Sequence, residues 1–204
     1  MVSGKTISLV SVACTKVPET ISAMLKCQEQ MKFDETKLFT HNENIYVGGI
    51  QFYKIPQLDY RGYNEFVGKY LAQYITTDYT LLVQNDGYIL DGSLWDDEFL
   101  QYDYIGAPWP PNTHFTKSGK EVRVGNGGFS FRSKKLLNVL NELHLPFTDM
   151  GTGFWHEDGA ICVHYREELE EYGIKFAPVE VAAKFSTELQ VPETIKSFGG
   201  HKYI

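Results

Sequence analysis

Cysteine, long hydrophobic runs and excess positive charge are all scarce in this sequence. No run approaches the ~18 apolar residues of a membrane span and no signal-peptide core is present, so we predict a cytoplasmic protein without a transmembrane segment. The three cysteines, Cys14, Cys27 and Cys162, are too few and too widely spaced for a disulfide scaffold, and we expect reduced thiols. The net charge of -7 argues against nucleic acid and anionic membranes as partners, because both need a basic face.

Several motifs of well-known chemistries are also absent. The sequence has no Cys-x-x-Cys pair and no zinc-ligand spacing of its histidines, which argues against a structural zinc site. It has no Gly-x-Ser-x-Gly motif, and no Gly-Lys-Ser/Thr follows its glycine-rich segment. These absences exclude a serine-hydrolase elbow and a Walker A loop.

The chain does contain enough apolar material for one domain. Its 204 residues are 43% apolar and 14% aromatic, so we predict a single globular domain over residues 1–204. Aromatic rings fill cores, but they also form platforms for sugar rings and nucleobases. Composition alone does not choose between these roles.

Strand-like and helix-like runs alternate through the first half of the chain. β-Branched or continuous apolar runs predict strands at 6–12, 37–40 and 79–84. Pro18 at a first-turn position and an apolar repeat over 63–74 predict the two intervening helices. This β-α-β-α-β order predicts an α/β fold with a doubly wound sheet, in which ligands bind beyond the carboxyl ends of the strands.

The second half is less regular. Its patterns predict short strands at 103–109, 129–132 and 174–176. They also predict two helices: one capped by Ser133 that buries Leu136, Leu137, Leu140 and Leu143, and one with Ile161, Tyr165, Leu169 and Tyr172 at helical spacing. Residues 110–124 are polar and carry prolines, which predicts a long mobile loop. The chain closes with a polar tail.

Candidate ligand-binding residues follow the predicted strands. Thr15 and Lys16 lie just past the first strand, and Asp86 lies past the third in the sequence Asn-Asp-Gly. A carboxylate there can hold Mg²⁺ or Mn²⁺ against a diphosphate, although Asn-Asp-Gly is also an ordinary turn sequence. His201, framed by glycines in the polar tail, is a candidate further ligand, while histidines in such tails more often face solvent.

Two later segments carry further candidates. Residues 125–128 (GNGG) could form a nest of backbone N–H groups for an anion or a sugar hydroxyl, or could only permit positive φ before a strand. Glu157 and Asp158 open a helix, where the helix dipole favours negative charge, and a carboxylate there could also deprotonate an acceptor hydroxyl. Trp155 and Phe154 would then supply a stacking surface for a sugar. His156 would contact the acceptor or support the site, although a histidine in such a place is more often an ordinary surface residue.

Taken together and in order, these pieces resemble a glycosyltransferase of the GT-A fold that uses nucleotide sugars. The sequence is most similar to the small DUF5672-type family, which includes glycosyltransferases of chlorella viruses, large viruses of algae. The resemblance implies one GT-A (Rossmann-like) domain with a central, mostly parallel mixed sheet flanked by helices. Because 204 residues is short for this fold, the chain is also consistent with being part of a larger multidomain enzyme. The stretches that carry the resemblance, over about residues 6–201, are LLVQNDGYIL, YDYIGAPW, VGNGGFSFRS, the HED before an aromatic-containing helix, IKFAP and FGGH.

The resemblance implies roles for single residues. Asp86 matches the last aspartate of the family's Asp-x-Asp metal motif, whose first aspartate is replaced by Gln84, and His201 matches the late histidine of the Mn²⁺ (or Mg²⁺) site. Asp158 matches the catalytic base of inverting relatives, with Glu157 beside it holding acceptor hydroxyls. Trp155 and His156 would contact the acceptor. The implied donor-binding residues are Thr15, Lys16, Arg61, Asn64, Gln84, Asn85, Asp86, Asn126, Gly127 and Lys202.

The implied function is the metal-dependent, inverting transfer of a hexose or deoxyhexose from a UDP-sugar to a hydroxyl of a glycan acceptor. Asp158 would take the acceptor proton while the metal and His201 or Lys202 stabilise the departing diphosphate. Two other classes stay open at this point. One is a metal-dependent hydrolase of nucleotides or phosphodiesters, and the other is a non-catalytic carbohydrate-binding module that uses the aromatic residues.

Overall fold

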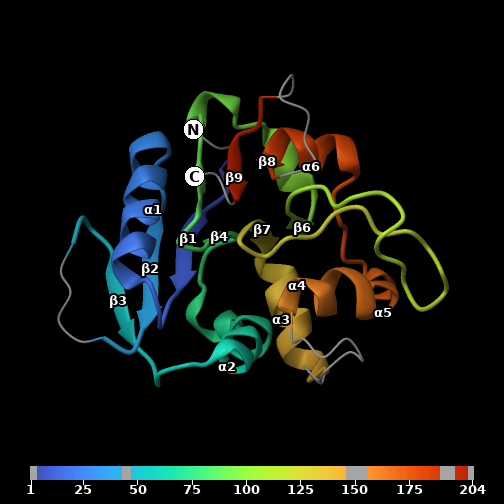
Figure 1. Ribbon diagram of the computed structural model, residues 1–204, viewed down its shortest axis with the longest axis horizontal. Coiled ribbons are helices and arrows are strands. Elements are labelled where there is room, and N and C mark those ends of the chain that lie inside the picture. Colours follow the sequence, from blue (N-terminus) through green and yellow to red (C-terminus); the bar gives the residue numbers. More distant parts are fainter. Residues whose placement is uncertain (1–3, 43–46, 146–155, 189–195, 202–204) are drawn as a thin grey trace.

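The computed structural model describes residues 4–42, 47–145, 156–188 and 196–201, and a six-stranded sheet forms its centre (Figure 1). The strand order is β3-β2-β1-β4-β7-β6, in which β3, β2, β1 and β4 run parallel and β7 is antiparallel to both β4 and β6. The predicted α/β fold with a mostly parallel mixed sheet is confirmed. The strands are β1 (Ile7–Val12), β2 (Glu35–Thr40), β3 (Gln51–Lys54), β4 (Tyr79–Val83), β6 (Tyr104–Ile105) and β7 (Phe129–Ser133).

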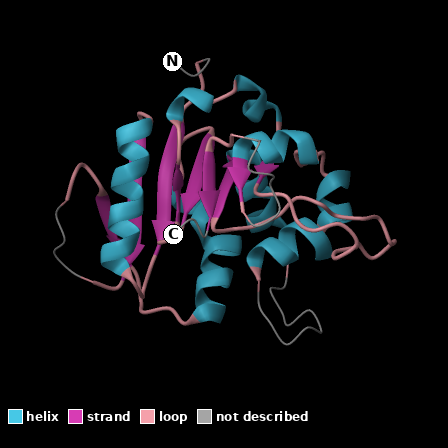
Figure 2. Cartoon of the chain, turned by 45° about the horizontal axis from the view of Figure 1, so that its top comes forward, coloured by secondary structure: helices cyan, strands magenta, loops and turns pink. Residues whose placement is uncertain are grey.

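Helices cover both faces of this sheet (Figure 2). Alternate strand residues point to opposite faces, so Leu9 and Leu81 pack in one core with α1 and α6, while Val10 and Leu82 pack in another with α2, η1 and α3. None of the helices in the described ranges is long and apolar enough to cross a membrane. The helices are α1 (Val17–Gln30), α2 (Tyr60–Glu65), η1 (Phe66–Tyr70), η2 (Leu71–Tyr74), η3 (Gly92–Leu94), η4 (Asp97–Gln101), α3 (Lys134–Leu143), α4 (Glu157–Gly159), η5 (Ala160–His164), α5 (Arg166–Glu171) and α6 (Val179–Phe185).

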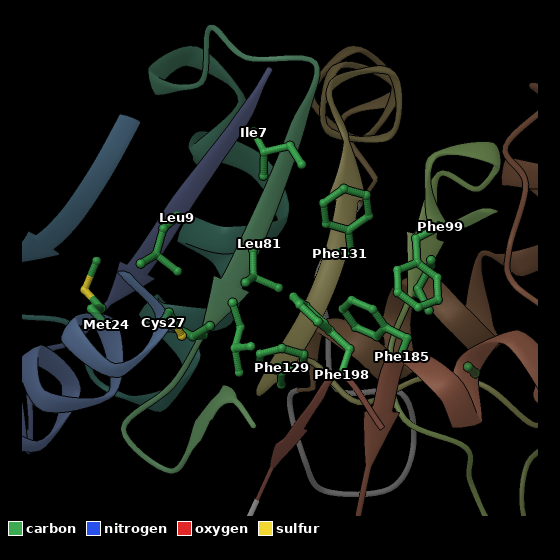
Figure 3. Close-up of a cluster of buried hydrophobic side chains, with 14 of the residues drawn as sticks. Ile7, Leu9, Met24, Cys27, Leu81, Phe99, Phe129, Phe131, Phe185 and Phe198 are labelled. Atoms are coloured by element: carbon green, nitrogen blue, oxygen red, sulfur yellow. The ribbon is translucent and has the colours of Figure 1, made fainter. Parts of the chain in front are cut away.

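A cluster of phenylalanines joins the sheet to the C-terminal part of the chain (Figure 3). Phe129 of β7 lies 5.2 Å from Phe185 of α6, and Phe185 lies 5.9 Å from Phe198, measured between ring centroids. Phe99 of η4 packs edge-on against Phe185. Because these rings are fully buried, they hold the segment around Phe198 against the sheet and place the residues that follow it.

The residues after Phe198 form the middle strand of a second, small sheet, where the sequence predicts a polar tail. Its order is β5 (Gly87–Ile89), β9 (Gly199–His201) and β8 (Ser186–Thr187), with β5 antiparallel and β8 parallel to β9. Gly87 pairs with His201, so the end of the described chain returns to the turn that follows β4. The expectation of a solvent-facing tail is wrong, because backbone pairing and the Phe198 anchor bury it.

Other predicted elements differ in detail. The helix predicted over 63–74 exists, but its hydrogen bonding changes from α in α2 to π in η1 and 3₁₀ in η2. The strand predicted at 174–176 is reduced to one bridge between Tyr104 and Phe176. The polar segment 110–124 is a hairpin, closed by backbone bonds such as Trp109 N–H to Arg123 O at 2.8 Å, and Lys120 ties it to Glu170 of α5. Ser133 does cap α3, as predicted.

Candidate functional site

A cleft with two adjoining lobes lies at one edge of the central sheet. The first lobe has a volume of about 350 Å³ and the second about 450 Å³, and both are lined by Tyr60, Tyr63 and Gln84. The first lobe is otherwise lined by Val12, Ala13, Cys14, Thr15, Thr20, Leu58, Asp59 and Asn85. The second is otherwise lined by Asn64, Trp109, Asn126, Gly127, Gly128, His156, Glu157, Asp158, Glu188 and His201.

The strand topology explains this location. Val12 ends β1 and Gln84 follows β4, and the strand order reverses between these two parallel neighbours, because β2 and β3 extend the sheet on one side of β1 and β4 lies on the other. Clefts at such a switch point are where doubly wound sheets bind ligands. The antiparallel strand β7 starts at the same edge, because Phe129 pairs with Val83 and Gln84 N–H donates to Gly128 O at 2.9 Å. The glycine-rich segment before β7 therefore faces the carboxyl end of β4.

The first lobe contains only part of the predicted donor-binding set. Thr15, Gln84 and Asn85 line it, and Gln84 Nε2 donates to the Tyr63 hydroxyl at 2.9 Å. Burial raises the pKa of Tyr63, so this phenol stays neutral. Lys16 has left-handed backbone at the start of α1, with φ of 50°. Like Arg61, its side chain is exposed, and neither residue lines a lobe.

Asp86 and His201, the two predicted metal ligands, are neighbours. His201 is 8% exposed, and its Nε2 lies 3.2 Å from Asp86 Oδ1. That oxygen is buried and makes no hydrogen bond within the described residues. An imidazole nitrogen beside an orphaned carboxylate oxygen fits Mn²⁺ or Mg²⁺, which commonly take few protein ligands and complete their coordination with phosphate and water. The described residues contain no group of three or more His, Cys, Asp and Glu side chains arranged for a metal.

The opposite side of His201 is also held in place. Its Nδ1 lies 3.2 Å from Asn126 Nδ2 and 3.4 Å from Glu188 Oε1, and Asn126 Nδ2 donates to Glu188 Oε2 at 2.5 Å. Gly128 is required here, because a Cβ at that position would overlap the imidazole ring. Asn126 has φ of 68°, a conformation that asparagine tolerates, and its Oδ1 accepts from Gly128 N–H at 2.9 Å. The GNGG segment therefore packs against the histidine as well as facing the lobe.

Asp158 is fixed by backbone donors. Its Oδ2 accepts from Gly127 N–H at 3.0 Å, and its Oδ1 accepts from Gly159 N–H at 2.8 Å. Each carboxylate oxygen has two lone pairs, so one on each remains for a ligand. The predicted base and the predicted nest are thus joined: the Gly127 N–H binds the protein's own carboxylate.

Glu157 is placed differently from its predicted role at the acceptor. It is 2% exposed, and its Oε1 accepts from Nη2 of the fully buried Arg132 at 2.8 Å. Burial raises the pKa of Glu157, against the opposing effect of Arg132. Burial disfavours the Arg132 cation as well, but Glu157, together with Tyr104 and Tyr63, outweighs that effect and the pKa of Arg132 is raised. We therefore interpret Glu157 as a support of α4 beneath Asp158.

Asn64 and His156 complete this support. Asn64 is buried, its Oδ1 accepts from Glu157 N–H at 2.7 Å and its Nδ2 donates to Tyr60 O at 2.7 Å. His156 Nδ1 lies 2.5 Å from the Tyr60 hydroxyl, which links α2 to the start of α4 across the two lobes. These bonds make Asn64 a brace between the two helices, and its role in binding the donor stays a prediction.

Several site residues were not predicted, among them Trp109, Arg132 and Glu188. Trp109 lines the second lobe. The predicted site residues Trp155 and Lys202 lie outside the described residues. Strand alternation in FSFRS gave a signal for Arg132, because Phe129 and Phe131 share one face and put Arg132 on the other. That face is covered, so an arginine there must be buried and paired.

Comparisons with known proteins agree with this fold. The sequence matches the family described as "Protein of unknown function (DUF5672)" over residues 51–201. Curated proteins give no match. Among solved structures, the apo form of the glycosyltransferase GlyE of Streptococcus pneumoniae is similar, with a TM-score of 0.58 at 11% sequence identity. The similarity covers 98% of this chain and 55% of GlyE, so the chain spans about half of that protein. This likeness shows a GT-A-like fold.

Proposed function

The chain belongs to the DUF5672 family, and from the geometry of its cleft we propose that it is a metal-dependent inverting glycosyltransferase. It would transfer a hexose or deoxyhexose from a UDP-sugar to a hydroxyl of a glycan acceptor. The fold shared with the glycosyltransferase GlyE supports the reaction class. A cytoplasmic location and a relationship to viral enzymes stay predictions.

The observation that carries the proposal is the order of groups along the cleft. The first lobe, with Tyr60 and Tyr63 as neutral aromatic walls, suits a base and ribose. The Asp86–His201 pair lies beside the second lobe, where a diphosphate leaving the first would pass. Asp158 lies in the second lobe, where a sugar and its acceptor would meet. A donor extended through both lobes would thus bring its anomeric carbon toward a carboxylate.

In the proposed reaction Asp158 acts as the general base. Its free lone pairs accept the proton of the acceptor hydroxyl as that oxygen attacks the anomeric carbon. The bond to the diphosphate breaks on the opposite face, so a single displacement inverts the configuration and needs no nucleophile from the protein. The backbone N–H groups of Gly127 and Gly159 keep the carboxylate in position before and after it takes the proton.

The leaving group gains negative charge, which the chain must help to bind. Asp86 and His201 are the residues that would hold Mn²⁺ or Mg²⁺, and the ion would supply Lewis-acid stabilisation of the diphosphate. Asn126 and Glu188 orient the His201 ring by holding it from its Nδ1 side. Partners of this kind fix which ring nitrogen faces the ligand.

The test is calorimetric titration with a panel of nucleotides and UDP-sugars, each with Mn²⁺ and with chelator. We expect UDP species to bind and to bind more tightly with Mn²⁺, and donor turnover to rise when acceptor glycans are added. Binding without any acceptor-dependent increase would favour a hydrolase instead. Failure of every nucleotide to bind would reject the transferase and favour a carbohydrate-binding module.

A further inference from the structure

Tyr60, Tyr63 and Gln84 line both lobes of the cleft, so a ligand that extends from one lobe into the other would pass them. We propose, on the basis of the function proposed above, that Tyr63 is a further donor-binding residue. Its hydroxyl, oriented by Gln84, donates a hydrogen bond to a phosphate oxygen of the nucleoside diphosphate where the two lobes meet.

The first argument is the unused proton of the Tyr63 hydroxyl. A phenol hydroxyl donates one hydrogen bond and also accepts. Gln84 Nε2 donates to the Tyr63 oxygen at 2.9 Å, so the phenol is the acceptor in this contact and its proton is directed away from the amide. No group in the described ranges accepts a hydrogen bond from this hydroxyl. The proton is therefore available to a ligand.

Tyr60 differs from Tyr63 in this respect. Its hydroxyl already has a partner in the protein, because it lies 2.5 Å from His156 Nδ1. Tyr60 is also 55% exposed, whereas Tyr63 is half-buried. A hydrogen bond is electrostatically stronger where water is partly excluded. Of the two tyrosines, Tyr63 is therefore better placed to bind an anion.

The second argument is the position of the Tyr63 hydroxyl between the lobes. The ring packs against the apolar core that contains α2, η1 and α3. Burial raises the pKa of Tyr63, the negative charge of Glu157 raises it further, and Arg132 acts in the opposite direction. Glu157 lines the second lobe, while Gln84 holds the same phenol oxygen from the end of β4. The hydroxyl thus lies at the boundary between the lobes.

The group of the donor that lies at this boundary is the diphosphate. In the proposed binding mode the base and ribose occupy the first lobe and the sugar occupies the second, so the phosphates lie between them. A hydrogen bond to an anionic oxygen is stronger than one to a neutral hydroxyl. A phenol placed here therefore contributes more by binding a phosphate than by binding a sugar hydroxyl.

The charges around the boundary are compatible with an anion. Glu157 is paired with Arg132, and Asp158 accepts hydrogen bonds from two backbone N–H groups. A divalent cation held by Asp86 and His201, as proposed above, would offset the charge of the phosphates. The phenol adds a directional hydrogen bond to this attraction and adds no charge of its own.

Gln84 decides the direction of the hydrogen bond with Tyr63. A carboxylate in its place would only accept, so it would take the phenol proton and leave none for a ligand. The amide donates through Nε2 and places no negative charge beside the diphosphate. A glutamine at this position therefore leaves the Tyr63 proton for the donor.

The test compares uridine with UDP in NMR titrations with Mg²⁺, which is not paramagnetic. The gain in affinity from uridine to UDP measures phosphate binding, and uridine alone reports on the first lobe. In Tyr63→Phe we expect this gain to fall about tenfold, because one hydrogen bond to an anion is lost. The affinity for uridine should stay within about twofold of the wild type, since the ring is kept.

Tyr53→Phe is the matched control. The Tyr53 hydroxyl also bonds to a glutamine side chain, Gln51, at 3.4 Å, but it belongs to the edge strand β3 and lies outside both lobes. Its removal should leave both affinities unchanged.

The variant Gln84→Met tests the orienting role of Gln84. We expect the gain from uridine to UDP to fall about threefold in this variant, because the phenol loses the bond that directs its proton. In the double variant Tyr63→Phe/Gln84→Met the second substitution should cause no further loss, since the two residues act as a unit. Additive losses would overturn the role of Gln84.

The outcomes separate this inference from the proposed function. An unchanged gain in Tyr63→Phe, an equal loss of uridine and UDP affinity, or an equal loss in Tyr53→Phe would overturn the phosphate contact. Equal affinity of the wild type for uridine and UDP would overturn it as well. UDP binding by the wild type leaves the proposed function standing in each of these cases. If the wild type binds neither uridine nor UDP, the inference and the proposed function are overturned together.

Discussion

The two lobes of the cleft share Tyr60, Tyr63 and Gln84, but the rest of the first lobe comes from the first half of the chain, most of the rest of the second lobe comes from the second half, and the two differ in chemistry. The first is formed by the ends of the parallel strands β1 and β4 and by α2, and its one carboxylate, Asp59, caps α2 by accepting from Gly62 N–H at 2.7 Å. The second is formed by the segments before β7, around α4 and along β9, and three carboxylates and two histidines line it. The regular half provides a surface with one carboxylate, which is used as a helix cap, and the irregular half provides the other carboxylates and the histidines.

The difference between the lobes shows how the fold supports ionisable side chains. In the first lobe the strand ends and aromatic rings need few supporting contacts. In the second, each carboxylate has its own support: Glu157 has Arg132, Asp158 has two backbone N–H groups, and Glu188 has the amide of Asn126. Buried charge is costly unless it is paired or hydrogen-bonded, so these supports are a condition for placing such groups together.

The largest expected effect is on turnover and comes from the second lobe alone. Asp158→Asn keeps the shape of the side chain but removes the base, and we expect turnover to fall by about 10²–10⁴-fold. UDP affinity, which depends on the first lobe, should stay within about twofold when measured by calorimetry, since the variant removes no contact there.

The control for that variant is Asp96→Asn, outside both lobes. Asp96 accepts from Glu98 N–H at 2.9 Å, and asparagine caps such a turn as well as aspartate. Turnover of this control should match the wild type. Retained turnover in Asp158→Asn, or a parallel loss of UDP affinity, would break the division between the lobes.

The next effect is on stability. Arg132→Met leaves Glu157 buried without its cation, and we expect a loss of about 3–5 kcal/mol in the free energy of unfolding measured with urea. The double variant Arg132→Met/Glu157→Met removes both charges and should recover most of that loss. A double variant as unstable as the single one would show that packing around Arg132, and not the stranded charge, sets the cost.

A matched ion pair outside the cleft sharpens this result. Lys37 Nζ lies 2.7 Å from Glu35 Oε2, with the Lys37 side chain 4% exposed, but the Glu35 side chain is 26% exposed. Lys37→Met therefore leaves a carboxylate that can reach water. We expect it to destabilise the protein less than Arg132→Met does, in the same urea measurement.

The contrast between the halves also explains what the sequence could predict. The strands β1, β2, β4 and β7 and the helices α1 and α3 follow from local patterns, because each has a continuous apolar run, a helical apolar repeat or a recognisable cap. The approach of Asp86 to His201 followed from resemblance alone. No local pattern shows that Gly199–His201 forms a strand, since two glycines and a histidine have no apolar alternation.

Long-range contacts decide the rest. The strand β9 exists because Phe198 is buried among Phe129, Phe185 and Phe99 and because Gly87 pairs with His201. The strand β3 pairs only at the edge of the sheet, and its four residues are exposed or half-buried, which gives a weak signal. In the sequence, Arg132 and Trp109 look like ordinary strand and loop residues, because the elements that cover them are distant along the chain. Which partners these side chains have is therefore decided by the tertiary structure and not by the local sequence.

A moderate effect is expected on the affinity for UDP, whose diphosphate would lie between the two lobes. Asp86→Ala removes one of the two proposed ligands, and we expect UDP affinity to fall about tenfold in Mn²⁺ and to be unchanged in chelator. Calorimetric titrations under both conditions measure this directly. An equal loss with and without Mn²⁺ would mean that Asp86 acts only through its contact with His201.

The smallest effect tests whether the lobes act independently. Tyr60→Phe removes the hydroxyl that lies 2.5 Å from His156 Nδ1, and Tyr60 is 55% exposed, so water can replace the lost partner. We expect a change of about 0.5 kcal/mol in stability and less than about threefold in UDP affinity or turnover. Because Tyr60 lines both lobes, a large drop in turnover with unchanged UDP affinity would mean that this bond holds α4, and with it Asp158, in place. The second lobe would then depend on the first for the position of its base.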